Sequence, residues 1–106
     1  MSAPADRGLT FAWFPTDLTL PPGSYAASER GDGAGGHIGV FVVPSGPAAF
    51  TNAATSQLNG AGWAGGPIDI EANEAEASFT KSGKFIAFGI NTYTYCGTGQ
   101  LTLHAN

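Results

Sequence analysis

The segment His37–Val43 reads HIGVFVV and is apolar at both of its alternating sets of positions. Successive side chains of a strand point to opposite faces of a sheet, so this pattern predicts a strand with both faces covered, in the centre of a sheet. Pro44 ends the run, because proline cannot donate to the hydrogen-bond ladder of a sheet.

The other apolar runs are also short, rich in β-branched and aromatic residues, and bounded by Gly or Pro. Those with the clearest strand pattern are Leu9–Phe14, Asp17–Leu20, Gly23–Ser28, Lys84–Asn91 and Gln100–Ala105. We therefore predict an all-β fold of about eight short strands over residues 1–106, an antiparallel β-sandwich of jelly-roll type. A small barrel is the alternative.

Residues 68–80 allow two interpretations. Apolar residues alternate from Ile68 to Ala72 and again, in the opposite phase, from Ala75 to Phe79. This favours two half-buried strands separated by a break at Asn73-Glu74. The alternative is a short helix over Glu71–Ser78, because Ala and Glu are good helix formers. We favour the strands and expect no helix elsewhere.

The segment Ser28–Gly36 reads SERGDGAGG and contains the spacing G-x-G-x-x-G. That spacing indicates a dinucleotide site only where a strand precedes it and a helix follows, and here a strand follows. We interpret the segment as a mobile glycine-rich loop without an apolar anchor, and we give its RGD tripeptide no weight.

The composition favours a surface that meets other proteins. Charged residues make up 11% of the chain, the net charge is −4, and there are four Lys and Arg residues. Without a basic stripe to neutralise phosphates, nucleic acid is not an expected partner. A neutral surface loses little solvation energy on contact, which suits a subunit that self-assembles.

The N-terminal residues lack a basic segment followed by a long apolar run, and no stretch of eighteen apolar residues occurs. We expect synthesis in the cytosol without a signal peptide, and no membrane span. The single Cys96 has no partner for a disulfide and no zinc-like spacing.

Near the C-terminus, alternation counted from Ile90 places Asn91, Tyr93 and Tyr95 on one side of a hairpin. Tyr rings with amide and hydroxyl groups match the C–H and hydroxyl groups of a sugar. The same group of side chains also suits packing against a neighbouring subunit. Asn91, Tyr93 and Tyr95 are thus our candidate carbohydrate or interface residues.

Trp13, Phe14 and Trp63 are further interface candidates, because the glycines around Trp63 leave little local core to bury it. Asp69 and Glu71 lie two apart on an expected strand and are weak candidates for calcium ligands. We predict no cofactor. Neither His37 nor His104 belongs to a recognisable catalytic motif, and no enzymatic activity is expected.

The closing segment GKFIAFGINTYTYCGTGQLTLHAN resembles the last two strands of the bacterial galactophilic lectins. In that family the loop between these strands ligates calcium, which holds sugar hydroxyls. The resemblance carries over to Asn91, whereas Thr94, Tyr95, Cys96 and Thr98 depart from the expected Asp and Asn ligands. It implies a lectin-like carbohydrate-binding module.

The chain as a whole is similar in type to small accessory proteins of tailed-phage-type particles and gene transfer agents. The likeness lies in its length, its Gly-, Ala- and Thr-rich strands and its low charge. It implies a non-enzymatic head spike base, decoration or fibre protein of an extracellular virion-like particle. The expected partners are further copies of the chain, capsid or fibre proteins, and host polysaccharide.

Overall fold

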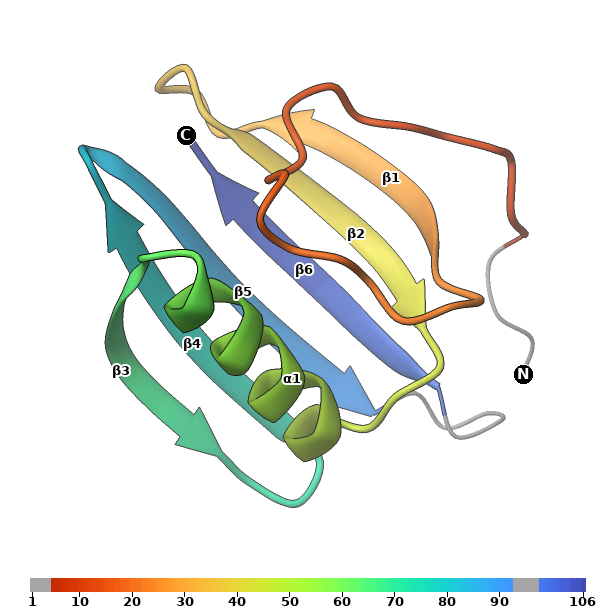
Figure 1. Cartoon of the computed structure of the whole chain (residues 1–106). Helices are drawn as coiled ribbons and strands as arrows, with labels where there is room; N and C mark the ends of the chain where they lie inside the picture. The colour runs from red at the N-terminus through yellow and green to blue at the C-terminus, as the bar shows by residue number, and fades with distance from the viewer. Residues whose placement is uncertain (1–4, 93–97) are drawn as a thin grey trace.

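The computed structural model describes residues 5–92 and 98–106, which form one antiparallel sheet and a helix. The elements in chain order are β1 (Tyr25–Gly31), β2 (His37–Val43), α1 (Pro47–Gly60), β3 (Ala64–Ile70), β4 (Glu74–Lys81), β5 (Lys84–Thr92) and β6 (Gly99–Ala105). The strand order in the sheet is β1-β2-β6-β5-β4-β3 (Figure 1).

The topology follows from one long crossover. β1 and β2 form a hairpin at one edge, and α1 then carries the chain across the sheet to the opposite edge. From there β3, β4 and β5 run back as a meander, and β6 fills the space between β5 and β2. The last strand therefore joins the two halves of the sheet.

One face of the sheet carries the core. Phe41, Leu101, Ile90 and Ala75 lie opposite one another on four neighbouring strands, and each is buried. Because strand side chains alternate, every second residue of these strands joins the same layer.

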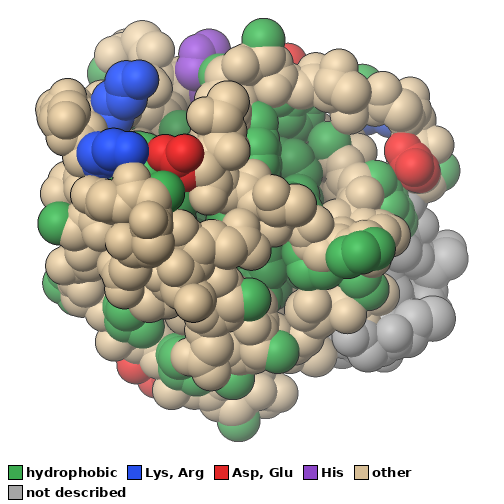
Figure 2. All heavy atoms as spheres, viewed as in Figure 1, with side chains coloured by type: hydrophobic (Ala, Val, Ile, Leu, Met, Phe, Trp, Pro, Cys, Tyr) green, Lys and Arg blue, Asp and Glu red, His purple; other side chains and the backbone are tan. Residues whose placement is uncertain are grey.

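Two segments cover that face (Figure 1). Helix α1 packs over β3, β4 and β5, and its Phe50 contacts Phe88 edge to face with ring centres 5.2 Å apart. The N-terminal segment, residues 9–20, lies over the β1 and β2 side and places Phe11 and Phe14 edge-on against Phe41. Figure 2 shows this covered side, with a hollow lined by hydrophobic side chains near its middle.

The opposite face of the sheet carries no helix or strand among the described residues. The predicted sandwich and its eight strands are thus not found in residues 5–92 and 98–106, which contain six strands in a single sheet. The β-rich character is confirmed. The prediction for His37–Val43 is confirmed in its bounds, but its two sides are not equally covered.

The prediction that the chain lacks a helix is wrong. Helix α1 begins with Pro47 at its first turn, a position that proline tolerates well. Phe50, Ala54 and Leu58 recur every fourth residue and are buried against the sheet. The exposed side of the helix carries alanines instead of polar residues, so the contrast between its two sides is weak and the helical period was missed.

The two strands predicted before β1 are also not formed. Leu9–Phe14 ends in a turn closed by a hydrogen bond from the Phe14 N–H to the Phe11 oxygen. Asp17–Leu20 follows another turn, in which the Leu18 N–H donates to the Pro15 oxygen. Leu18 is buried and the three aromatic residues are partly buried, but Leu9 is 37% exposed. These residues pack as an irregular segment on a sheet whose strands are already paired with one another.

The strand interpretation of residues 68–80 is confirmed, and the helix over Glu71–Ser78 is wrong. β3 and β4 pair as a hairpin whose turn is closed by the Glu71 N–H donating to the Glu74 oxygen at 2.8 Å. Ile68 and Ile70 were expected to be half-buried, yet they are 45% and 41% exposed. β3 is an edge strand paired with β4 alone, so it gains cover from one side only.

The C-terminal hairpin is confirmed in its two strands, which pair Ile90 with Leu101. Residues 93–97 between them lie outside the described residues. Of the expected glycine-rich loop, Ser28–Gly31 extends β1 instead, so the loop narrows to residues 32–36. Among the described residues, no helix has the length and apolar character needed to cross a membrane.

Candidate functional site on the uncovered face of the sheet

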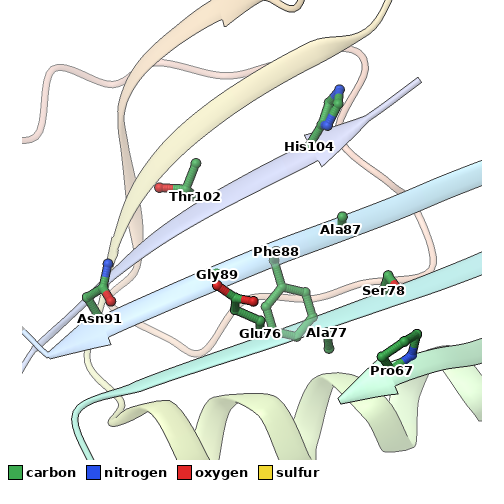
Figure 3. A pocket seen from close by; sticks show the side chains of 10 residues that line it. All are labelled: Pro67, Glu76, Ala77, Ser78, Ala87, Phe88, Gly89, Asn91, Thr102 and His104. Atoms are coloured by element: carbon green, nitrogen blue, oxygen red, sulfur yellow. The ribbon is translucent and has the colours of Figure 1, made fainter. Parts of the chain in front are cut away.

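The uncovered face holds a shallow groove of about 510 Å³ over β4, β5 and β6 (Figure 3). Its lining residues are Pro67, Glu76, Ala77, Ser78, Ala87, Phe88, Gly89, Asn91, Thr102 and His104. Phe88 and Ala77 contribute from below, since both are buried on the covered side. The groove surface is therefore formed mainly by the alternate, outward-pointing residues of β4, β5 and β6, and Pro67 of β3 borders it.

Small residues make the groove. Gly89 lies at its centre, paired with Glu76 on one side and with Thr102 on the other. Ala87, the next outward residue of β5, also has a short side chain. Because β5 presents almost no side chain between its neighbours, the longer side chains of β4 and β6 form walls around it.

The walls supply hydrogen-bonding groups of several kinds. Glu76 offers a carboxylate, Asn91 an amide, Thr102 a hydroxyl and His104 an imidazole, and Figure 3 shows these side chains around the floor. This set can hold a polar, hydroxyl-rich molecule or the polar surface of another protein.

His104 is held in place from two sides. Its Nε2 lies 2.7 Å from Oδ2 of Asp32, and the ring of Phe85 meets it edge to face with centroids 4.8 Å apart. Asp32 belongs to the glycine-rich loop, so this contact ties the β1–β2 connection to the last strand. Sequence reasoning missed it, because the two residues are 72 positions apart.

Asp32 is also bound by its own loop. Its Oδ1 accepts hydrogen bonds from the N–H groups of Ala34 and Gly36, at 2.7 and 2.9 Å. These bonds and, above all, the one with His104 lower the pKa of Asp32 from 3.8 to about 2. The loop that we expected to have no apolar anchor is thus held by polar contacts.

Asn91 lies on the uncovered face, as alternation from Ile90 predicted, and it is exposed. Tyr93 and Tyr95, the other two members of that predicted group, lie outside the described residues. The structure therefore places one of the three in the groove and adds Thr102 and His104, which the sequence analysis had not chosen for it.

Asp69 and Glu71 find no metal-binding arrangement within residues 5–92 and 98–106, which contain no group of three or more His, Cys, Asp or Glu side chains suited to an ion. A hydrogen bond with Glu74 and the negative charge of Asp69 raise the pKa of Glu71. These neighbours thus disfavour the ionised form of the Glu71 carboxyl on the edge hairpin.

Trp13, Phe14 and Trp63 border one common pocket on the covered side. Trp63 is 8% exposed, and its Nε1 donates to Asp17 at 2.9 Å, so the prediction of an exposed Trp63 is wrong. The glycines around Trp63 belong to the end of α1 and to β3. Residues distant in the sequence bury its side chain. Trp13 and Phe14 are half-buried.

We compared the chain with protein-family models, curated proteins and solved structures, and found no match in any of the three.

The pairing of Asp32 with His104 predicts a pH-dependent contribution to stability. Because folding lowers the pKa of Asp32 from 3.8 to about 2, its contribution is complete above that ordinary value and is lost as the pH falls through this interval. The destabilisation caused by Asp32→Asn, measured by urea unfolding across this range, should therefore shrink toward the acidic end. A difference that stays constant with pH would contradict this assignment.

Proposed function

We propose that this chain is a non-enzymatic structural and attachment subunit that assembles through the uncovered face of its sheet. The observation that carries the proposal is the neutrality of that face. On β2, β6 and β5, His104 is the single ionisable side chain among the outward-pointing residues. The others are Ile38, Val40, Val42, Gln100, Thr102, Phe85, Ala87, Gly89 and Asn91.

This composition favours contact with another protein surface. Ile38 and Val40 are only partly buried, although a β-branched apolar residue gains about 1.5–3 kcal/mol on full burial. Gln100 and Thr102 beside them cost less free energy to desolvate than charged side chains would. Charged residues such as Arg30 and Glu76 lie toward the two sides of the face, where an interface tolerates them best.

A second copy of the chain is the partner that this face fits most directly. Two such sheets laid face to face, about 10 Å apart, would form a β-sandwich between subunits. In this proposal the sandwich expected from the sequence exists in the assembly, with each chain supplying one of its two sheets. Ile38 and Val40 of β2, which are only partly buried in the single chain, would supply its apolar centre.

The geometry also supports a non-enzymatic role. Thr102 and His104 carry the hydroxyl and imidazole nearest to each other in the groove, and they lie two residues apart on the outward face of β6. Two residues along a strand span roughly 7 Å, and the hydroxyl of Ser78 lies roughly 10 Å from His104 across β5, so both are too far for a proton to pass directly to the imidazole.

A subunit of a phage-like particle, such as a head spike base, decoration or fibre protein, has the same requirements. It needs a compact fold, a neutral assembly face and few long charged side chains. In this role the chain would be made in the cytosol and end in an extracellular particle. Capsid or fibre proteins would then be partners in addition to further copies of the chain.

Ala87→Arg tests the assembly face, since it places a cation at the centre of the uncovered surface. Ala53→Arg is the matched control, because Ala53 is exposed on α1. We expect light scattering to show a concentration-dependent oligomer for the wild type and for Ala53→Arg, and a monomer for Ala87→Arg. A monomeric wild type at the highest concentration reached, or equal dissociation of both variants, would contradict the proposal.

The groove favours one alternative, a lectin-like carbohydrate-binding module. Asn91 and Thr102 present amide and hydroxyl groups together, and Glu76 adds an acceptor. These are the groups that pair with sugar hydroxyls. Tyr93 and Tyr95 remain the predicted aromatic part of such a site.

A glycan array, probed with and without a chelator, tests this alternative. We expect binding that is retained with the chelator, because Asp69 and Glu71 gain no third ligand from the described residues. Asn91→Ala should abolish the signal, whereas Asn52→Ala, an exposed change on α1, should leave it intact. Absence of any glycan signal would remove the lectin reading and leave the assembly proposal standing.

A further inference from the structure

The uncovered face of the sheet has a raised part and a hollow part. β2 presents Ile38 and Val40, two β-branched side chains that are only partly buried, and we call this pair the ridge. β5 presents Ala87 and Gly89, which border the groove with almost no side chain, and we call this pair the hollow (Figure 3). β6 lies between β2 and β5. The ridge and the hollow are thus separated by a single strand.

The strand register sets the ridge level with the hollow. Two rows of paired residues cross β2, β6 and β5, and they are Ile38–His104–Ala87 and Val40–Thr102–Gly89. Each ridge residue therefore has a hollow position at the same height along the strands, on the other side of β6.

This spacing suits a two-fold axis that runs along β6, just above the face. A rotation by 180° about that axis exchanges the positions of β2 and β5 and leaves heights along the strands unchanged. It brings Ile38 of one copy over Ala87 of the other, and Val40 over Gly89. The contact occurs twice, because a two-fold interface uses the same patch on both subunits. The strands of the two sheets remain aligned, as in a β-sandwich.

Charge is distributed unequally across the same face. β1 presents the exposed cation Arg30, whereas β4 presents the exposed carboxylates of Glu74 and Glu76. Within residues 5–92 and 98–106, neither Arg30 nor Glu76 takes part in an ion pair. Both charges are therefore available to a second copy of the chain.

The rotation about β6 brings these opposite charges together. β1 and β4 each lie two strands from β6, on its two sides, so β1 of one copy comes over β4 of the other. Arg30 is level with Ser78, and Glu76 lies two residues further along β4, or roughly 7 Å away. An extended arginine side chain can bridge that separation.

An axis across the strands would give a poorer fit. It would lay each strand over its own copy, so that the ridge meets the ridge and the hollow faces the hollow. An unfilled hollow loses packing contacts. The carboxylates of Glu74, Glu76 and Asp69, which share one side of the face, would also gather against their own copies, and like charges in contact are unfavourable.

Building on the assembly face proposed above, we propose that the chain forms a two-fold symmetric dimer whose axis runs along β6. The ridge of each copy fills the hollow of the other. Arg30 of each copy pairs with Glu76 of the other at the rim of the interface.

The outward residues of β6 suit a position on the axis, where each meets its own copy. Gln100 and Thr102 carry an amide and a hydroxyl, which both donate and accept hydrogen bonds and so can pair with themselves. His104 keeps its contact with Asp32 at 2.7 Å.

Charge reversal tests this arrangement, with the dimer Kd measured by analytical ultracentrifugation. Arg30→Glu and Glu76→Arg, each made alone, should raise the Kd by roughly tenfold, because symmetry places the resulting like-charge contact in the interface twice. The double variant Arg30→Glu/Glu76→Arg should return the Kd to within about threefold of the wild-type value, since the pair is restored with its signs exchanged.

Lys84→Glu is the matched control. Lys84 is an exposed cation on β5, two residues before the buried Ile86 and hence on the covered side. Lys84→Glu should leave the Kd unchanged. Lys84→Glu/Glu76→Arg has the same net charge as the exchanged pair, yet it should bind as weakly as Glu76→Arg alone. Circular dichroism should show the wild-type spectrum for every variant, because all the substituted side chains are exposed.

The outcomes separate this arrangement from the assembly proposal on which it rests. A wild type that stays monomeric would contradict both. A wild-type dimer that is weakened equally by Arg30→Glu and Lys84→Glu, or that the exchanged pair fails to restore, would overturn the axis along β6 and leave assembly through this face standing.

Discussion

Trp13 lies directly over Gly39, and this close approach lets the N-terminal segment pack against the sheet. A Cβ atom at position 39 would be 2.9 Å from Cη2 of Trp13, closer than carbon atoms approach without displacement. In this position Trp13 stacks on His37, and Phe11 and Phe14 contact Phe41. Glycine in the middle of a strand is otherwise unfavourable, so its presence here has a packing reason. The rest of the structure depends on this contact.

The division of the covered side follows from it. Helix α1 is too narrow to shelter six strands, and it covers β3, β4 and β5. The N-terminal segment completes the core over β1 and β2, and a small pocket lies where it meets the ends of β5 and β6. All covering segments within residues 5–92 and 98–106 then lie on one side of the sheet. On β2, β6 and β5 the other side carries mostly uncharged side chains, with a groove along β5.

The sequence predicted those parts of the fold that local patterns determine. Period-two alternation located His37–Val43, Lys84–Asn91 and the last strand, and it placed Asn91 on the outward face. Prediction from the sequence failed where one pattern of apolar residues is compatible with two different structures. Leu9–Phe14 is apolar because it lies against a sheet rather than within one, and the exposed alanines of Pro47–Gly60 hide the apolar face of a helix. The Asp32–His104 and Asp17–Trp63 contacts join distant residues, so no local signal announced them.

The central claim is that the sheet has one packed face and one open face, and paired glycine substitutions test it most directly. Gly39 points into the packed face, whereas a Cβ at Gly89 would lie on the open face at least 3.9 Å from its nearest neighbours. We predict that Gly39→Ala lowers the free energy of unfolding by about 1–3 kcal/mol and shifts tryptophan fluorescence, because Trp13 must move. Gly89→Ala should be neutral or stabilising by up to about 1 kcal/mol. Equal destabilisation by the two substitutions in urea unfolding would contradict the account.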